Sequence, residues 1–262
     1  MFEVMSDYRV IFVTVVRDYA TYDKYVRSNT NCKDISFVFF GNNIENIPIP
    51  VHYNNYLDSY DYSHDAWFVF CHEDFEFLEN PRNILQGLDK NVLYGPIGHL
   101  RVGAFGFGVQ SVRGEISITK KGEDAQKSWK IGCRLQKPAK VETFDCCCLI
   151  VHSSLVQRLE LRFDKNLEFD MYVEDFCATA HQRGNVSSCA VQMEVCHHSD
   201  AVATERLWRH LPYLAEKYKK HCYTGTLTYF GTPSWQKQLQ DFLAAFVRRV
   251  FIRKKDKDCI NF

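Results

Sequence analysis

The chain has 262 residues, of which 32 are basic, 32 are acidic and 46% are apolar. Such a chain is long enough for one α/β domain with a large core, and its apolar content excludes a disordered protein. The balanced charge gives no indication of a nucleic-acid partner. The 11 cysteines are odd in number and follow no regular framework, so we expect reduced, partly buried thiols in a cytoplasmic protein.

The first apolar run of the chain, at positions 10–16, lies between Arg9 and Arg17. It is too short for the apolar region of a signal peptide and far too short to span a bilayer. We therefore expect neither a signal peptide nor a membrane-spanning helix from this run. The run of β-branched residues instead predicts a strand that is buried on both faces.

The N-terminal part of the chain alternates between predicted strands and helices. Apolar runs predict buried strands, and segments of helical character lie between them, the first of which Asp18 is expected to cap. Repeated strand–helix–strand units predict a mainly parallel, doubly wound sheet of the Rossmann type. The strands are expected at 9–16, 35–40, 66–71 and 91–100, and the helices at 18–29, 54–63 and 81–88.

The pattern breaks between positions 101 and 140, where glycines and charged residues are scattered. We expect a long loop or an irregular hairpin there; a phosphate-binding glycine loop is the alternative, but no Gly-Lys-Ser/Thr follows. Farther along, Gly184 is expected to end a helix at the C′ position. The later strands are expected at 143–151 and 187–199, and the later helices at 169–184, 204–220 and 234–253.

Three polar residues, His72, Glu73 and Asp74, follow the apolar strand predicted at 66–71. In doubly wound sheets, ligands bind beyond the carboxyl ends of the strands. An imidazole and carboxylates at such an end suit Mn²⁺ or Mg²⁺, and these ions commonly bridge diphosphates. The alternative is an ordinary solvated strand end.

Two pairs of adjacent polar residues are further candidates. Glu174 and Asp175 lie in the helix predicted at 169–184, where they either complement the helix dipole or accept a proton from an attacking hydroxyl. His197 and His198 end a predicted strand. Alternation along a strand sends their side chains to opposite faces, so one of the two can serve any given site.

A buried carboxylate is the fourth candidate. Asp145 falls inside the apolar strand predicted at 143–151, where a carboxylate is costly unless it is paired or bound to a ligand. The consecutive cysteines that follow it, Cys146 to Cys148, would alternate between the faces of that strand. They therefore cannot converge on one zinc ion.

The order of these motifs resembles the GT-A fold glycosyltransferases, in particular family-2-like bacterial enzymes with an HQD-type motif. The likeness runs from Tyr8 to Lys220. The resemblance implies an α/β three-layer sandwich of the GT-A type that binds a nucleotide-sugar, with Mn²⁺ or Mg²⁺ bridging the diphosphate to a DxD-type motif. The segments that carry it are AWFVFCHEDFEF, LYGPIGHLRVG, VETFDCCCLIV, LRFDKNL, FDMYVEDFCATAHQRG, EVCHHS and LPYLAEKY.

The resemblance implies a set of metal ligands. Asp74 matches the final acid of the family's motif, His72 takes the place of its first acid, and Glu73 occupies the variable position. His197 matches the histidine of the family's closing HxS, with His198 as the alternative if the strand register is shifted. The departure from Asp-x-Asp to His-Glu-Asp still leaves an imidazole, which is a competent Mn²⁺ ligand.

The resemblance also implies catalytic and substrate-binding residues. Asp175 matches the family's general base and Glu174 would support it, so Asp175→Asn is expected to abolish turnover while sparing nucleotide binding. Asp145 matches the aspartate that lines the sugar and acceptor pocket, with Cys146 in place of the family's glycine. The other implied substrate-binding residues are Asn42, Asp18 and Arg101, and the segments at 16–18 and 42–43 fall where the family contacts the nucleobase and ribose.

The implied activity is metal-assisted transfer of a hexose from a nucleotide-sugar to a hydroxyl of a saccharide or lipid-linked acceptor, with inversion at the anomeric carbon. Such a role would suit polysaccharide biosynthesis. Two alternatives remain open. One is a GT-A-like protein that binds a nucleotide or sugar without transferring it, and the other is a metal-dependent phosphoesterase.

The C-terminal segment at 234–253 spaces its apolar residues as an amphipathic helix does, and Arg and Lys crowd its end. Such a helix can lie on an anionic membrane surface as a peripheral contact, or it can pack on the domain or on another subunit. We therefore expect a glycosyltransferase-like domain at 1–232 and a basic amphipathic helix and tail at 233–262. The protein is expected in the cytoplasm or on the inner face of the membrane.

Overall fold

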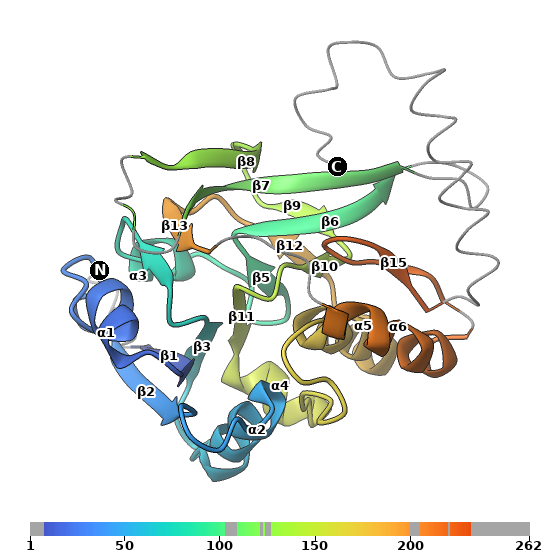
Figure 1. Ribbon diagram of the computed structural model, residues 1–262, viewed down its shortest axis with the longest axis horizontal. Helices are drawn as coiled ribbons and strands as arrows, with labels where there is room; N and C mark the ends of the chain where they lie inside the picture. Colours follow the sequence, from blue (N-terminus) through green and yellow to red (C-terminus); the bar gives the residue numbers. More distant parts are fainter. Residues whose placement is uncertain are drawn as a thin grey trace, which may run out of the picture.

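A seven-stranded sheet forms the centre of the computed structural model, which describes residues 8–102, 109–120, 123, 127–199, 205–219 and 221–231. Its strand order is β2-β1-β3-β11-β5-β12-β9 (Figure 1). The strands are β1 (Arg9–Val16), β2 (Ser36–Gly41), β3 (Ala66–Cys71), β5 (Leu93–Gly95), β9 (Ala139–Val141), β11 (Cys148–His152) and β12 (Ser188–Ala190).

The sheet is mixed: five of its seven strands point the same way, in line with the prediction, but three of its six neighbouring pairs are antiparallel. Strand β1 runs parallel to both β2 and β3, and β5 runs parallel to β12. Strand β11 is antiparallel to both β3 and β5, so β5 points the same way as β3. Strand β9 is antiparallel to β12. The carboxyl ends of β1, β2 and β3 therefore meet at one edge of the molecule.

Side chains alternate between two cores on the two faces of this sheet. Val13 and Phe68 pack on one face, under helices α2 (Ile49–Ser59), α4 (Ser153–Leu159) and α5 (Tyr172–Gly184). Phe12 and Val69 pack on the other face. The second core is covered by α1 (Tyr19–Tyr22), its π-helical continuation η1 (Asp23–Arg27), α3 (Arg82–Leu85) and a second sheet.

The second sheet has the order β10-β6-β7-β13-β4, with β8 paired to β7. In Figure 1 it lies above the central sheet, away from α2 and α4. Its strands are β4 (Phe75–Phe77), β6 (Ile97–Val102), β7 (Val109–Thr119), β8 (Trp129–Cys133), β10 (Thr143–Phe144) and β13 (Val195–His198). Of the two alternatives expected at 101–140, a long loop or an irregular hairpin, the described residues show the hairpin, because β7 pairs antiparallel with both β6 and β8. Most glycines considered for a phosphate loop, at 103–108, lie outside the described residues.

Three predicted strands are each divided between the two sheets. The strand expected at 91–100 is β5 and β6, which are separated by Pro96, a residue without the N–H that a continuous ladder needs. The strand at 187–199 is likewise β12 and β13. The strand at 143–151 breaks at a turn, so Asp145 lies between β10 and β11 and not inside a strand. Face alternation therefore does not apply to Cys146 and Cys147.

Strand β2 was expected to be fully buried, but it is half exposed, and Phe39 is 44% exposed. Its position at the edge of the sheet explains the difference, because it has a neighbouring strand on one side only.

The helix ends follow local backbone signals. Asp18 caps α1 by accepting hydrogen bonds from the N–H groups of Ala20 and Thr21, as predicted. Helix α5 begins later than expected, after Met171 in the left-handed region with φ 66°. At its other end the left-handed residue is Asn185, with φ 50°, so Gly184 is the last helical residue and not the C′ residue.

The C-terminal part described is helix α6 (Glu205–Lys217) and a small hairpin of β14 (Tyr223–Thr224) and β15 (Tyr229–Phe230). The predicted helix at 234–253 and the proposed boundary at 232 lie outside the described residues. Among the residues that are described, no helix combines the length and the apolar character needed to cross a bilayer.

Candidate active site

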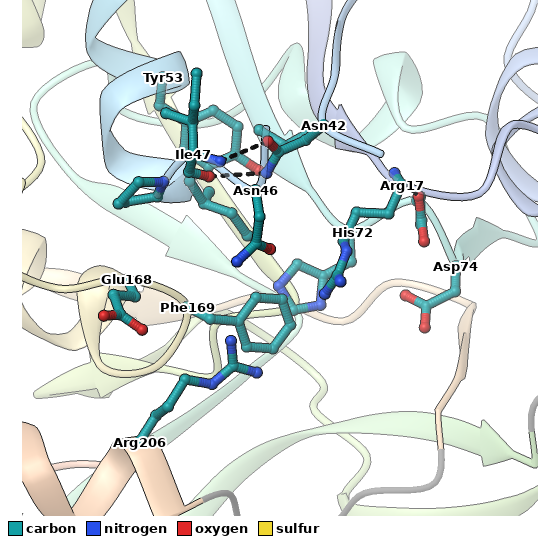
Figure 2. Close-up of a pocket in the computed structure, with 14 residues that line it drawn as sticks. Arg17, Asn42, Asn46, Ile47, Tyr53, His72, Asp74, Glu168, Phe169 and Arg206 are labelled. Carbon is teal, nitrogen blue, oxygen red and sulfur yellow. Dashed lines mark hydrogen bonds between the residues drawn. The ribbon is translucent and has the colours of Figure 1, made fainter. Parts of the chain in front are cut away.

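A cavity of about 310 Å³ lies at the carboxyl ends of the parallel strands β1, β2 and β3 (Figure 2). Arg17 follows β1, and His72 and Asp74 follow β3, so the end of each strand brings polar side chains to the same rim. Phe169 and Arg206 line the cavity from the other side. The Arg206 guanidinium lies 5.1 Å from the centre of the Phe169 ring. Figure 2 shows these side chains around one hollow.

Three predicted metal ligands converge beside this cavity. The ligand atoms of His72, Asp74 and His197 all lie within 4.8 Å of one another. His197 Nε2 is 3.3 Å from Asp74 Oδ1, with the two side chains 12% and 20% exposed. Within the described structure, neither of these two buried atoms makes a hydrogen bond of regular geometry. The two atoms face each other at ion-pair distance, and a cation bound between them would give both a regular partner.

Backbone pairing holds these residues together. The N–H of His198 donates to the carbonyl oxygen of Asp74 at 2.9 Å, and His197 faces Phe75 across the antiparallel pair of β13 and β4. The N–H of His72 donates to the carbonyl oxygen of Cys147 at 3.1 Å. The turn after β3 is thus fixed to both β13 and the turn before β11.

His198 points away from the cluster, as alternation along the strand predicts. Its ring stacks on Tyr25 with centroids 3.7 Å apart, and its Nε2 lies 2.8 Å from Glu76 Oε2. His197 is therefore the histidine of the pair that serves the cluster.

Tyr172 orients His72. The Tyr172 hydroxyl donates to the carbonyl oxygen of Cys146 at 2.9 Å and lies 3.0 Å from His72 Nε2. Because its one proton is used on the carbonyl, the hydroxyl accepts from Nε2–H. This assigns the proton to Nε2 and leaves the Nδ1 lone pair available for a cation.

The electrostatics of the cluster favour an anionic Asp74. Burial alone would raise the pKa of Asp74, but the neighbouring His197 and His72 lower it below its usual range. Burial opposes charge on His197, yet Asp74 and Asp145 raise its pKa. Burial lowers the pKa of His72, which keeps that imidazole neutral, as metal ligation requires.

Asp145 is a partly buried carboxylate with a partner. Its Oδ1 accepts a hydrogen bond from the Cys147 N–H at 2.9 Å. Burial would raise its pKa, but the charge of His197 and the Cys147 N–H lower it. Asp145, Cys147 and His197 form a second possible ligand group. Burial raises the pKa of the Cys147 thiol well above its usual value, so this group is the weaker candidate.

Glu174 faces the same region from helix α5. It is 2% exposed, its Oε2 lies 3.0 Å from the Cys146 thiol, and its Oε1 accepts from the Thr226 hydroxyl at 3.0 Å. Burial raises its pKa to about 7, with the charge of Asp145 acting in the same direction. A carboxyl group that titrates near neutral pH can accept a proton from an attacking hydroxyl.

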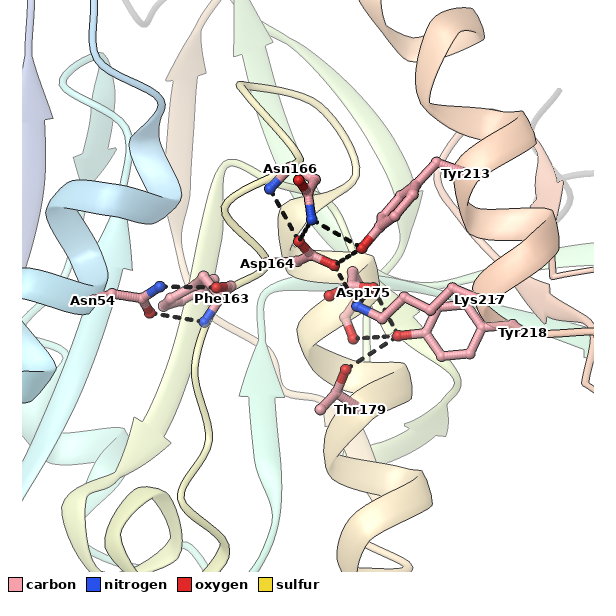
Figure 3. A network of polar contacts seen from close by, with 9 residues as sticks. All are labelled: Asn54, Phe163, Asp164, Asn166, Asp175, Thr179, Tyr213, Lys217 and Tyr218. Atoms are coloured by element: carbon pink, nitrogen blue, oxygen red, sulfur yellow. Dashed lines mark hydrogen bonds and ion pairs between the residues drawn. The ribbon is translucent and has the colours of Figure 1, made fainter.

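Asp175, the predicted general base, faces helix α6 instead (Figure 3). Its Oδ1 lies 2.7 Å from both Lys217 Nζ and the Tyr218 hydroxyl. Lys217 also bonds Asp164, which accepts from Tyr213. The structure thus places Asp175 in an ion-pair network between α5 and α6, while Glu174 lies near Asp145 and bonds Cys146 and Thr226.

The remaining predicted residues have mainly backbone partners. Glu73 accepts hydrogen bonds from the N–H groups of Arg17 and Asp18, at 2.6 and 2.9 Å, and so shapes the turn after β1. Asn42 lines the cavity, but its amide is bonded in both directions to the backbone of Ile47. The Asp18 carboxylate caps α1.

Arg101 also serves a backbone group. Its guanidinium donates to the carbonyl oxygen of Cys222 at 3.0 Å, on the segment that leads into β14. It is therefore placed to hold the β14–β15 hairpin.

Arg17, in the segment at 16–18 that the resemblance assigns to nucleobase and ribose contacts, lines the cavity. Four other residues that line or orient the site were not predicted. Phe169 and Arg206 line the cavity, Tyr172 orients His72, and Thr226 bonds Glu174. These four come to the site through tertiary packing, which leaves no local signal in the sequence.

No protein-family model and no curated protein matches this chain. The chain is similar to several solved structures. One is A197 from STIV, with a TM-score of 0.38 and 14% identity over 75% of this chain and 97% of that chain. Another is S. aureus TarS 1-349, with a TM-score of 0.47 and 8% identity over 95% of this chain and 77% of that chain.

TarS 1-349 in complex with UDP-GlcNAc is also similar, with a TM-score of 0.45, 8% identity and the same coverage of 95% and 77%. All these TM-scores lie below 0.5. The function of this chain therefore rests on the geometry of its own site.

Proposed function

We propose that the protein is a nucleotide-sugar-dependent glycosyltransferase that uses Mn²⁺ or Mg²⁺. The observation that carries the proposal is the convergence of His72, Asp74 and His197 at the rim of the cavity beyond the parallel strands. His72 and Asp74 flank one turn after β3, His197 comes from a distant part of the chain, and their order along it resembles that of the GT-A enzymes.

The residues fit the proposed ion. Two imidazole nitrogens and one carboxylate oxygen are a suitable donor set for Mn²⁺, and the buried atoms Asp74 Oδ1 and His197 Nε2 have no regular hydrogen bond among the described residues. When bound, such a cation would neutralise charge on a diphosphate.

The cavity fits the rest of a nucleotide-sugar. Arg17 and Arg206 supply positive charge for the diphosphate. Phe169 adds an aromatic ring to the lining, with the stacked His72 ring 5.2 Å and the Arg206 guanidinium 5.1 Å from its centre. Asn42 holds the loop that closes the cavity beside β2.

Glu174 is the residue that we assign as the general base, in place of Asp175. Its carboxylate accepts the proton of the acceptor hydroxyl as that oxygen bonds to the anomeric carbon. The bond between the anomeric carbon and the diphosphate oxygen breaks, and its electron pair leaves with the nucleoside diphosphate. Attack from the face opposite the leaving group inverts the configuration. Asp145 lies near Glu174, and this nearness supports a role for Asp145 in binding the sugar or acceptor.

The experiment is a thermal-shift panel of UDP-, GDP-, CMP- and dTDP-sugars with and without Mn²⁺. One class of donor should raise the melting temperature more strongly with Mn²⁺, because a ligand that binds the native state stabilises it. Asp74→Asn should remove the Mn²⁺ effect, and the exposed Asp61→Asn should retain it.

Turnover then separates the alternatives. Release of nucleoside diphosphate from the stabilising donor supports a transferase, and NMR of the product gives the anomeric configuration. Stabilisation without donor turnover would instead support a nucleotide-sugar-binding protein. The absence of any Mn²⁺-dependent shift would refute the proposed site.

A further inference from the structure

The hairpin of residues 222–230, which we call the strap, lies beside Glu174. Figure 1 draws its strand β15 between the second sheet and helices α5 and α6. The strap consists of β14, a turn at 225–228 and β15. It contributes nothing to either large sheet, so other contacts must hold it in place.

Side chains of the second sheet and of its flanking strand ends hold the strap. Gln110 Nε2 donates to the carbonyl oxygens of Gly225 and Thr226 at 2.7 and 2.9 Å. Arg101 donates to the carbonyl oxygen of Cys222. The Thr224 N–H donates to Glu142 Oε2 at 2.8 Å, and the Thr143 hydroxyl donates to the carbonyl oxygen of Thr224. These contacts fix the turn in one position. The side chains that hold the strap are those of Arg101, Gln110, Glu142 and Thr143.

The turn of the strap meets Glu174 directly. The Thr226 hydroxyl donates to Glu174 Oε1 at 3.0 Å, and the Thr226 N–H lies 3.4 Å from the same oxygen. The approach is close, because a Cβ on Gly225 would lie 3.1 Å from the Thr228 carbonyl oxygen and 3.5 Å from Glu174 Cγ. The opposite oxygen, Oε2, is held by the Cys146 thiol at 3.0 Å.

We propose that Thr226 is a positioning residue for Glu174, and that the strap is the element that presents it. This inference rests on the proposed function, in which Glu174 accepts the proton of the acceptor hydroxyl. The hydroxyl of Thr226 and the thiol of Cys146 together fix both oxygens of the carboxylate, so its rotamer is set before an acceptor arrives. Thr226 acts through Glu174 and does not itself take the proton.

The surroundings of Glu174 make this contact measurable. Asp145 is the charged group that faces it among the described residues, and its charge opposes ionisation of Glu174. The Cys146 and Cys177 thiols and the Tyr172 phenol also face it. Burial raises the pKa of each of these three groups, so they stay neutral near pH 7. The Thr226 hydroxyl is then one of few groups that favour the ionised carboxylate.

The test compares Thr226→Val, which keeps the shape and loses the donor, with Thr226→Ser, which keeps the donor. Thr228→Val is the matched control, because the Thr228 hydroxyl bonds to the Tyr229 carbonyl oxygen within the strap. Two readouts are needed. One is the pH profile of kcat/KM for transfer, and the other is the ¹³C NMR titration of the Glu174 carboxyl in protein without donor, assigned with Glu174→Gln.

Thr226→Val should move both the NMR titration and the acid limb of kcat/KM upward by roughly half to one pH unit, because one hydrogen bond to a charged group is lost. The KM for the donor should stay within about twofold of its wild-type value, since the donor cavity is not lined by Thr226. Thr226→Ser should restore the wild-type profile, and Thr228→Val should not change it. Circular dichroism checks that each variant folds. If Thr226→Val does not fold, Thr226→Ala is used in its place.

An NMR titration that is unchanged in both Thr226→Val and Thr226→Ala would overturn the inference, even in an active transferase. A shifted titration in a protein that transfers no sugar would support the Thr226–Glu174 coupling while contradicting the proposed function. The two proposals can therefore fail separately.

Discussion

Glu174 and Asp175 are adjacent on α5 and are 2% and 1% exposed, but they lie in two different regions of the molecule. Consecutive residues of a helix point about 100° apart. Glu174 faces Cys146 and Thr226, which are neutral donors, whereas Asp175 faces the cation of Lys217. The first environment leaves a carboxyl group that titrates near neutral pH, and the second uses its charge to hold α6. Two adjacent acids can thus have separate roles in chemistry and in folding.

The largest expected effect on kcat comes from replacing each of these two acids in a separate variant. Glu174→Gln should lower kcat about 100- to 10,000-fold, the usual contribution of a general base, and should leave donor binding intact. Asp175→Asn should lower kcat less than about tenfold, because its carboxylate bonds Lys217 and Tyr218 and not the cluster. Steady-state kinetics with the donor found by thermal shift measures both.

The opposite ranking would contradict the assignment. If Asp175→Asn abolished turnover while a folded Glu174→Gln remained active, the base would be Asp175, as the sequence resemblance implies.

The next effect concerns the α5–α6 interface. Lys217→Met leaves the Asp175 carboxylate buried without its cation, and breaking a buried pair in this way costs roughly 3 kcal/mol of unfolding free energy. Urea unfolding followed by circular dichroism measures the change. Lys219→Met is the control, because Lys219 pairs with Glu216 on the exposed surface and should contribute less than about 1 kcal/mol. If the two variants were equally stable, the ion pairs of Lys217 with Asp164 and Asp175 would not contribute to the stability of the protein.

The pH dependence gives a third effect. Because burial raises the pKa of Glu174 to about 7, the proton-accepting form should decline below that pH. The rate constant kcat/KM should fall about tenfold per pH unit on the acid side. A profile measured with Mn²⁺ held saturating should show this limb, and a profile that is flat from pH 7 to pH 5 would exclude Glu174 as the base.

The smallest effect concerns the orientation of His72. Tyr172→Phe removes the hydroxyl that accepts from His72 Nε2–H, so Mn²⁺ should bind about tenfold more weakly, as is usual for the loss of a group that orients a metal ligand. Electron paramagnetic resonance of free Mn²⁺ measures this without activity. Tyr62→Phe is the control, since its hydroxyl bonds the Leu57 carbonyl oxygen. Unchanged Mn²⁺ affinity in Tyr172→Phe would contradict the assigned proton position.

Apolar runs and the alternation of side chains along a strand predicted much of this structure. The continuous apolar run of β3 placed His72 and Asp74 at a strand end, and strand alternation separated His197 from His198. Chain order alone does not specify which sheet a segment joins. For this reason the sequence did not predict the break that places Asp145 in a turn.

The orientation of α5 was not predictable for a similar reason. Which of the two acids bonds α6 and which bonds the strap depends on where these two elements pack against α5. Arg206 reaches the cavity from α6, which is distant in sequence from every strand end that forms the rim. Contacts of this kind are properties of the folded chain and not of any local segment.

We propose that His72, Asp74 and His197 form one cation site beside the cavity. The decisive measurement is a titration of Mn²⁺ in the presence of UDP, followed by electron paramagnetic resonance, with the wild type, Asp74→Asn and Asp61→Asn. We expect one strongly bound Mn²⁺ per wild-type chain, which is retained in Asp61→Asn and lost in Asp74→Asn. Equal Mn²⁺ binding by the wild type and a folded Asp74→Asn variant would contradict it.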